Sequence, residues 1–366
     1  MFLYCKIMNY RETLFFIGKC LTVNIEKNNF EIVKNQLEKE IIDWDSIVKI
    51  STNHYVFFAL YCNLKKANLL DFLPTELVEY MQHLTQLNRE RNKEIKKQVL
   101  EINTLLLKNN IIPVFLKGVG NLFQDFYDDI GERLMVDIDF IVEKKSYQKT
   151  INLIKEFGYC KLDKLNHHSP SFKHYPRLQK EGCVTAVEIH KELLIEKFSD
   201  EFNYETIKEN CIKINNITIL SYNNQMVLSI LGNQINDDGY YYKNLTLKQG
   251  YDVYLLSKKT NTKNAFEKFD KLKHPLNCFL GSCSQVFNNV DSLIYNSTIE
   301  TEKYLKDFNL YLVDHKKRKS DYKKIKFKLY LIRKKDLFLK SIFKKEYRNW
   351  LINDFLIKLK LKKMIT

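Results

Sequence analysis

Two aspartates separated by a single residue lie in the alternating run Val-Asp-Ile-Asp-Phe-Ile-Val at residues 136–142. Residues two apart in a strand project from the same face, so Asp137 and Asp139 are predicted to lie side by side. Adjacent carboxylates repel each other unless a cation lies between them. Because divalent metals neutralise such pairs in phosphoryl chemistry, the spacing indicates a metal site. A strand face exposed to solvent is the alternative.

A glycine turn precedes the aspartates. The apolar run at residues 111–116 ends at Lys117-Gly118, and Arg133 stands four residues before the first aspartate. Glycine lets the backbone approach a phosphate closely, and amides at the start of a following helix would face the anion. Lys117 could add a point charge. Arg133 is predicted either to pair with Asp137 or to reach a phosphate, and a plain strand-to-helix turn remains the alternative for the glycine.

The order Leu-Lys-Gly, then Arg, then Asp-x-Asp resembles the uncharacterised nucleotidyltransferase family of the polymerase-beta-like superfamily. The resemblance extends upstream through Asp43-Trp44 and His54, and loosely downstream to about residue 255. One departure is Val119, where the superfamily usually has a second glycine or a serine. In this superfamily a glycine turn holds the triphosphate, two strand aspartates bind Mg²⁺, and a later strand supplies a third acidic residue.

Carried onto this chain, the resemblance implies a catalytic and metal-binding set of Asp137, Asp139 and Glu188, the last from the run Val-Glu-Ile-His at residues 187–190. It also implies nucleotide contacts from Lys117, Gly118 and Arg133. The cofactor would be Mg²⁺ or Mn²⁺ and the substrate a nucleoside triphosphate such as ATP. An acceptor hydroxyl would attack the α-phosphate in line, and pyrophosphate would leave.

Two other functions stay open. A catalytically inactive nucleotidyltransferase fold could serve as a binding module for RNA or an acidic partner. An enzyme directed at nucleic acid could use its basic tail to dock RNA. The three acidic residues favour an enzyme, but the sequence does not choose among RNA, a protein hydroxyl, a small metabolite and a sugar phosphate as acceptor.

The histidines are weaker candidates than the carboxylates. His190 is predicted to share a strand face with Glu188, either as a neighbour of the site or as a hydrogen-bonded support for its ligands. His54 lies in an apolar helical segment and is expected to be a satisfied core residue rather than a ligand. A polar cluster that either lines the cleft or forms a solvated turn contains His167, His168, His174, Tyr175 and Arg177.

Three regions follow from the periodicity of the chain. Residues 1–110 are predicted as an N-terminal helical region, residues 111–220 alternate strands with short helices, and residues 221–366 form a C-terminal helical region with a basic tail. Alternating strands and helices predict an α/β core. We therefore expect an α+β protein in which a polymerase-beta-like nucleotidyltransferase core is flanked by helices on both sides.

Individual elements are predicted as follows. Strands are expected at residues 112–116, 136–142, 159–162, 172–178, 185–192 and 216–220. Helices are expected at residues 13–23, 30–42, 47–64, 76–108 (as one helix or two), 119–127, 147–157 with Ser146 as its cap, 225–235, 246–257 and 265–272, and a loop is expected at residues 239–242.

Positive charge is concentrated at one end. Residues 301–366 hold 21 Lys and Arg against 7 Asp and Glu, which is +14 of the net +15. Residues 316–345 interleave these charges with Tyr322, Phe327, Tyr330, Phe338 and Phe343. Basic patches with aromatic residues suit nucleic acid or an acidic partner. An amphipathic helical region with lysines along its edge explains the pattern equally well.

The cellular compartment is predicted from the cysteines, the first residues and the length of the apolar runs. Eight cysteines stand at positions 5, 20, 62, 160, 183, 211, 278 and 283 without zinc spacing, and we expect reduced, mostly buried thiols. The first residues contain polar breaks too early for a secretory signal. No run approaches the roughly 20 apolar residues of a membrane span. A soluble cytoplasmic protein without membrane contacts is therefore expected.

Overall fold

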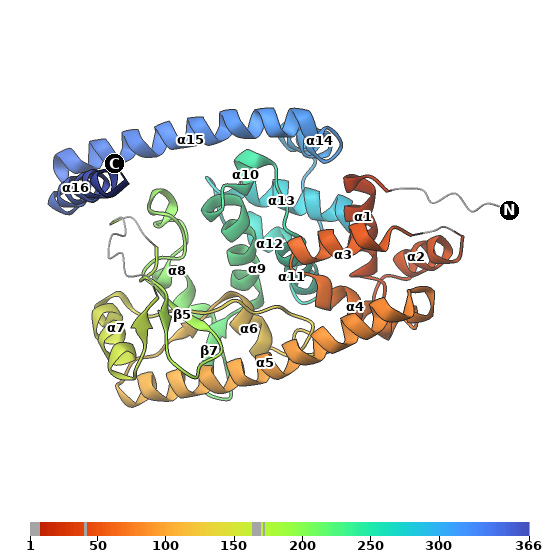
Figure 1. Cartoon of the computed structure of the whole chain (residues 1–366), viewed down its shortest axis with the longest axis horizontal. Helices are drawn as coiled ribbons and strands as arrows, with labels where there is room; N and C mark the ends of the chain where they lie inside the picture. Colours follow the sequence, from red (N-terminus) through yellow and green to blue (C-terminus); the bar gives the residue numbers. More distant parts are fainter. Residues whose placement is uncertain (1–7, 40–41, 163–169, 171–172, 366) are drawn as a thin grey trace.

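The computed structural model describes residues 8–39, 42–162, 170 and 173–365 (Figure 1). Five helices precede the first strand: α1 (Tyr10–Cys20), α2 (Lys27–Lys39), α3 (Trp44–Asn53), α4 (Phe57–Lys66) and α5 (Thr75–Lys108). The fifth is a single helix of 34 residues that runs along one side of the molecule. Buried side chains recur along it at helical intervals, as expected for a helix with one face on the core.

The strands form one mixed seven-stranded sheet in the order β3-β4-β5-β2-β1-β7-β6. They are β1 (Val114–Phe115), β2 (Asp137–Ile141), β3 (Cys160–Lys161), β4 (Leu178–Gln179), β5 (Ala186–His190), β6 (Cys211–Ile214) and β7 (Ile217–Leu220). Helices α6 (Lys117–Phe123), α7 (Tyr147–Glu156) and α8 (Tyr204–Ile207) lie between strands. The parallel pairs β2–β5 and β1–β7 form its centre, which is the part that positions the acidic residues.

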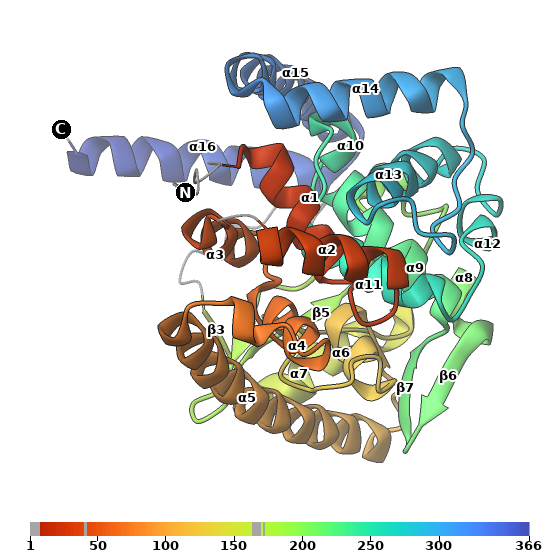
Figure 2. The same cartoon turned by 90° about the vertical axis from the view of Figure 1, so that its right-hand side faces the viewer.

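The remaining helices follow the sheet. They are α9 (Tyr222–Leu231), the π-helical turn η5 (Gly232–Asn236), α10 (Gly239–Tyr242), α11 (Leu247–Ser257), α12 (Lys263–Phe266), α13 (Lys273–Val286), α14 (Ile299–Val313), α15 (His315–Phe343) and α16 (Lys345–Ile365). In Figure 1, α15 runs along the side of the molecule opposite α5, and Figure 2 shows α14 and α16 on that same side.

The two faces of the sheet differ. One face belongs to an apolar core with α5 and α7, to which β2 contributes Ile138 and Phe140 and β5 contributes Val187 and Ile189. Alternation along each strand then directs the acidic residues to the other face. There Ile141 and other apolar side chains join a second core that contains α1, α4, α9, α11 and α13. The helices before the sheet therefore divide between the two cores.

Several element predictions need correction. The helix predicted at residues 47–64 is two helices, because Tyr55 adopts a left-handed backbone (φ 58°) between α3 and α4. The loop predicted at residues 239–242 is the short helix α10, and the helix predicted at residues 265–272 is reduced to α12. The strand predicted at residues 172–178 falls partly outside the described residues and shortens to β4. Ser146 precedes α7 but makes no capping hydrogen bond.

Among the elements that were not predicted individually are the edge strand β6, the short helix α8 and the buried helix α13. Helix α13 contains Pro275 in its first turn, a position that tolerates proline. Within the part of the chain that the structure describes, no helix is long and apolar enough to cross a membrane. The seven described cysteines are free; Cys20, Cys278 and Cys283 are buried, and Cys160 is exposed.

Candidate active site

A cleft of about 790 Å³ opens on the polar face of the sheet. Residues of β2 and β5 line one part of it, and residues of α9, η5 and α11 line another. Arg333 of the basic helix α15 also reaches it. All six residues implied by the resemblance lie at this cleft: Lys117, Gly118, Arg133, Asp137, Asp139 and Glu188.

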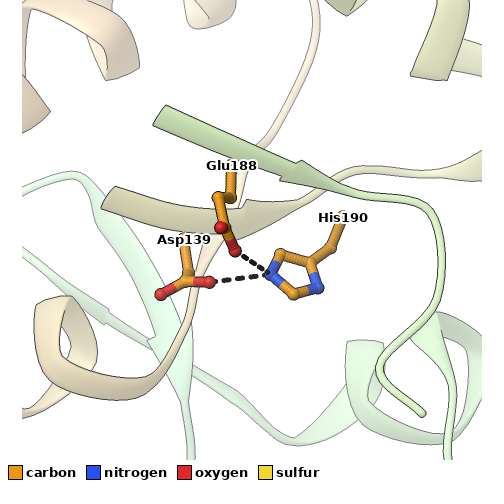
Figure 3. A group of neighbouring side chains, drawn as sticks. All are labelled: Asp139, Glu188 and His190. Carbon is orange, nitrogen blue, oxygen red and sulfur yellow. Dashed lines mark hydrogen bonds and ion pairs between the residues drawn. The ribbon is translucent and has the colours of Figure 1, made fainter. Parts of the chain in front are cut away.

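Asp139 and Glu188 are brought together by the register of two parallel strands. Asp139 of β2 pairs directly with Glu188 of β5, so their side chains leave the same sheet face. His190 follows two residues later on that face. Its Nε2 lies 2.8 Å from Asp139 Oδ1 and 3.8 Å from Glu188 Oε2 (Figure 3). The ligand atoms of these three buried residues lie within 4.8 Å of one another, close enough to share one metal ion.

Asp137 lies on the same face of the sheet, two residues before Asp139 on β2. Arg177 bridges it to Glu188, with Nη2 2.7 Å from Asp137 Oδ2 and Nε 2.8 Å from Glu188 Oε1. Burial raises the pKa of Asp137 to about 6, and the negative charges of Glu188 and Asp139 act in the same direction. The three carboxylates therefore repel one another even with the guanidinium in place, which is the condition that a divalent cation relieves.

Lys117 supplies the second counter-charge. Its backbone is left-handed (φ 51°), and its Nζ lies 2.5 Å from Asp139 Oδ1. Burial acts to lower the pKa of Lys117, but the charge and hydrogen bond of Asp139 raise it above its ordinary value. Burial likewise opposes ionisation of Asp139, whose pKa is lowered by the ammonium and by His190. The pair is therefore charged on both sides.

Packing within the protein, as well as a position at the cleft, explains why residue 118 is a glycine. A Cβ at this position would lie 2.6 Å from the sulfur of Met135. Such a distance is shorter than real Cβ contacts, so a larger residue would require the end of the Met135 side chain to move. Close approach of backbone and side chain within the protein accounts for this glycine without any ligand.

One of the two predicted roles of Arg133, an ion pair with Asp137, is wrong, because Arg133 pairs with Asp252 instead. Its Nη2 lies 2.7 Å from Asp252 Oδ2 of α11, and its Nε donates to Tyr127 Oη at 3.1 Å. Tyr127 in turn donates to Asp252 Oδ1 at 2.6 Å. Both charged side chains are buried, at 9% and 4% exposure. The guanidinium therefore fastens the segment before β2 to α11, while Arg133 still borders the cleft.

Helix α5 holds that same segment from the other side. Asn88 Nδ2 donates to the carbonyls of Gly131 and Arg133, and Asn92 Nδ2 donates to those of Ile130 and Arg133. Buried carbonyls outside regular structure need such partners. The sequence signal was a pair of asparagines four residues apart in the middle of a helix, where asparagine is a poor helix former and needs another reason to be present.

The other histidines divide as follows. His174 lies at the cleft with Nε2 3.6 Å from Glu188 Oε2, and its Nδ1 lies 2.9 Å from the carbonyl of Tyr175. Burial lowers the pKa values of both His174 and His190. His174 and Arg177 of the predicted polar cluster therefore do line the cleft. His167 and His168 lie outside the described residues.

His54 has a hydrogen-bond partner at each ring nitrogen, as expected, but it is partly buried rather than part of the core. The amide of Leu247 donates to His54 Nδ1 at 3.1 Å, and His54 Nε2 lies 2.9 Å from Tyr10 Oη. Because the amide can only donate, Nδ1 accepts and the hydrogen of the neutral ring is on Nε2. The backbone carbonyl of His54 also accepts from the amide of Lys248. His54 thus satisfies two free amides at the start of α11, the helix that carries Asp252.

Acid should destabilise this arrangement through His54. Burial lowers the pKa of His54 from 6.5 to about 4. Its contribution to stability is therefore complete above pH 6.5 and is lost as the pH falls toward 4, since the unfolded chain then binds the extra proton. The full shift is worth roughly 3 kcal/mol. His54→Asn keeps an acceptor for Leu247 but cannot titrate, so the free energy of unfolding should depend less on pH between 7.5 and 4.5.

Chemical denaturation at several pH values measures this difference directly. His83→Asn, on the exposed surface of α5, is the matched control and should keep the pH dependence of the wild type. His54→Ala should cost about 1–3 kcal/mol at neutral pH, because the amide of Leu247 and the hydroxyl of Tyr10 lose the imidazole as a partner. Equal pH dependence of the His54→Asn and His83→Asn variants would show that His54 does not titrate during unfolding.

Comparison with known proteins identifies the family. The model of the uncharacterised nucleotidyltransferase family matches residues 40–284, so the chain belongs to that family. The family assignment made from the Leu-Lys-Gly, Arg and Asp-x-Asp pattern is therefore confirmed. The matched residues include every element that lines the cleft except α15. Among curated proteins, none matches this chain.

One solved structure similar to this chain is that of JHP933 from Helicobacter pylori. The sequence identity is 12% and the TM-score 0.30, over 67% of this chain and 98% of that protein. Similarity at this level supports no argument about the fold or the function.

Proposed function

We propose that the chain is a divalent-metal-dependent nucleotidyltransferase with a polymerase-beta-like core at residues 111–220, flanked by helical regions at residues 1–110 and 221–366. It transfers a nucleoside monophosphate from a nucleoside triphosphate to an acceptor hydroxyl and releases pyrophosphate. The observation that supports this most strongly is the convergence of Asp137, Asp139 and Glu188 on one face of β2 and β5, at the wall of a cleft. Membership of a nucleotidyltransferase family agrees with it.

The donor set fits Mg²⁺ or Mn²⁺. Carboxylate oxygens are the preferred ligands of these hard cations, and the three carboxylates repel one another without a cation. Asp137, Asp139 and Glu188 would hold the metal, with His190 fixing the orientation of Asp139 through the 2.8 Å contact. When bound there, the metal would neutralise charge on the triphosphate and on the leaving pyrophosphate.

The cations of the site have separate tasks in this proposal. Lys117 and Arg177 balance the carboxylates in the metal-free protein through direct ion pairs. Arg177 is half exposed at 50%, so its side chain can turn from the carboxylates toward a phosphate when a metal takes over their neutralisation. Gly118 lies beside them at the cleft. Arg133 acts indirectly, by fastening the segment before β2 to α11.

Label transfer tests the proposal. The protein is incubated with Mg²⁺, a fractionated cell extract and each of the four nucleoside triphosphates in turn, starting with ATP, labelled at the α-phosphate. We expect one nucleotide to label one fraction. The γ-labelled form of the same nucleotide is the control and should leave that fraction unlabelled, because pyrophosphate is released. Label from the γ-phosphate would instead indicate a kinase.

A catalytically inactive binding module is the second candidate, and the basic helices are the observation that favours it. On α15 and α16, exposed lysines alternate with exposed aromatic residues, among them Phe327, Phe338 and Phe343. Lys340, Lys344 and Tyr347 all contact Glu196, which fixes the helices to the body of the protein. Absence of label from every nucleotide, together with RNA binding, would favour this candidate over the enzyme.

In either case we expect the basic helices to bind RNA, and in the enzyme to position an RNA acceptor. Binding should weaken steeply with salt, since each phosphate contact releases counterions. Replacing five exposed lysines of α15 by glutamine should weaken RNA binding and flatten the salt dependence by up to about 0.7 log units per contact for single strands. These residues are Lys323, Lys326, Lys328, Lys334 and Lys335.

Filter binding over a range of salt concentrations measures both quantities. Nucleotide affinity serves as the internal control and should not change, because none of the five lysines lines the cleft. RNA binding that is absent at low salt, or that survives the five substitutions undiminished, would contradict the assignment.

A further inference from the structure

The two cations that the sequence assigned to phosphate are already engaged. Arg133 is paired with Asp252, and Lys117 is paired with Asp139. A triphosphate carries several negative charges, and binding it calls for cations that are not already neutralised by carboxylates. A triphosphate at this cleft would therefore be bound by positively charged groups that carry no ion pair.

Two lysines meet this condition. Lys173 and Lys248 both line the cleft and are partly buried, and neither forms an ion pair with any residue that the structure describes. Lys248 Nζ lies 5.0 Å from the centre of the Tyr55 ring, which shields one side of the ammonium from water. Asp237 also lines the cleft, and its charge acts on both lysines without an ion pair to either.

The backbone at both lysines is fixed from outside the cleft. The carbonyl of Lys173 accepts hydrogen bonds from the amides of Lys191 and Glu192, directly after β5. Lys248 is in the first turn of α11, and its amide donates to the carbonyl of His54. The backbone positions from which the two side chains extend are therefore set before a ligand arrives, which lowers part of the cost of binding.

Both lysines feel the charges of other groups at the cleft. Burial, and after it the charge of Arg133, lowers the pKa of Lys248 to about 8. Burial and the charge of Lys117 lower the pKa of Lys173. Asp139 acts on both lysines in the opposite direction. Ammonium groups held among other cations and partly out of water are stabilised by an anion, and the anion that a nucleotidyltransferase would admit to this cleft is the triphosphate.

We propose that Lys173 and Lys248 form the binding site for the triphosphate in this cleft. The inference rests on the proposed function, because it requires a nucleoside triphosphate as substrate. Lys248 comes from the helical region after the sheet and Lys173 from the segment before β4, so the phosphates would be held between these two regions and the carboxylates of β2 and β5.

Inorganic tripolyphosphate with Mn²⁺ is the probe, because it tests the phosphate contacts whichever base the enzyme prefers. Lys173→Met and Lys248→Met should each weaken its binding about tenfold, the usual worth of a hydrogen bond to a charged group. Lys173→Arg and Lys248→Arg, which keep the charge, should retain most of the affinity. Lys213→Met, on the exposed edge strand β6, is the matched control and should bind as the wild type does.

Two further measurements separate this role from a structural one. Thermal unfolding should show that neither methionine variant is less stable, since each removes a partly buried charge that is repelled by other cations. Binding of Mn²⁺ alone should be unchanged. Wild-type affinity for tripolyphosphate in the Lys173→Met/Lys248→Met protein would overturn the inference and leave the proposed function standing. If the wild type bound no nucleoside triphosphate at all, both would fall.

Discussion

Replacement of Asp137 and Asp139 by asparagine should abolish metal-dependent nucleotide binding and label transfer while the chain stays folded. The double substitution removes two of the three carboxylates that β2 and β5 present to the cleft, and it keeps their size and one oxygen acceptor on each side chain. Residues that only support metal ligands are commonly worth 10–100-fold in affinity, so loss of two ligands should exceed roughly 100-fold. Calorimetry with Mn²⁺, and with ATP and Mg²⁺, measures the effect.

Stability should change little in the same protein. Lys117 loses its charged partner, a cost of about 1–3 kcal/mol, but the repulsion that raises the pKa of Asp137 disappears as well. Asp270→Asn, at an exposed position after α12, controls for a change of charge alone. An unchanged affinity for ATP and Mg²⁺ in the double variant would show that the acidic face is not the metal site.

The local part of this site could be predicted from sequence because strand periodicity is a local property. Alternation at residues 136–142 is enough to place Asp137 and Asp139 on one face, and β2 has that alternation. The pairing of Asp139 with Glu188 could not be predicted from local periodicity. The register between β2 and β5 depends on how the intervening residues fold, and only the family resemblance supplied Glu188.

Long-range partners could not be predicted for the same reason. Asp252 lies 119 residues after Arg133 in the chain, and nothing near either residue specifies the other. A signal was present all the same. Asp252 stands in the otherwise uncharged run Gly-Tyr-Asp-Val-Tyr at residues 250–254, and a charged residue in the buried face of a helix requires a partner.

Backbone conformation explains the largest error in the helices. Mostly apolar residues at 47–50 and 55–64 lie on either side of the polar run Ser-Thr-Asn-His at residues 51–54, which precedes the break. The prediction of one helix followed apolar periodicity, which reports which side chains are buried rather than where the chain turns. The structure turns at Tyr55, whose left-handed backbone brings His54 and Tyr55 to the start of α11. Non-glycine residues rarely adopt this conformation, and no local pattern at Tyr55 announces it.

The buried pair of Arg133 and Asp252 should give the largest change in stability of any single substitution discussed for this chain. Arg133→Met leaves the carboxylate of Asp252 buried without a cation, and breaking a buried pair in this way typically costs 3–5 kcal/mol. The variant Arg133→Met/Asp252→Leu removes both charges and should regain much of that loss, because well-packed apolar residues often replace a buried ion pair without cost. Chemical denaturation of the three proteins measures the free energies of unfolding.

The same variants decide what Arg133 does for the nucleotide. If its role is to fasten the segment before β2 to α11, the double variant should recover stability and nucleotide affinity together, since the aspartates of β2 return to their places. If the guanidinium instead holds a phosphate, affinity should stay low in the double variant although stability returns. We expect the first result, because each nitrogen of the guanidinium already donates a hydrogen bond, to Tyr127, to the carbonyl of Leu134 and to Asp252.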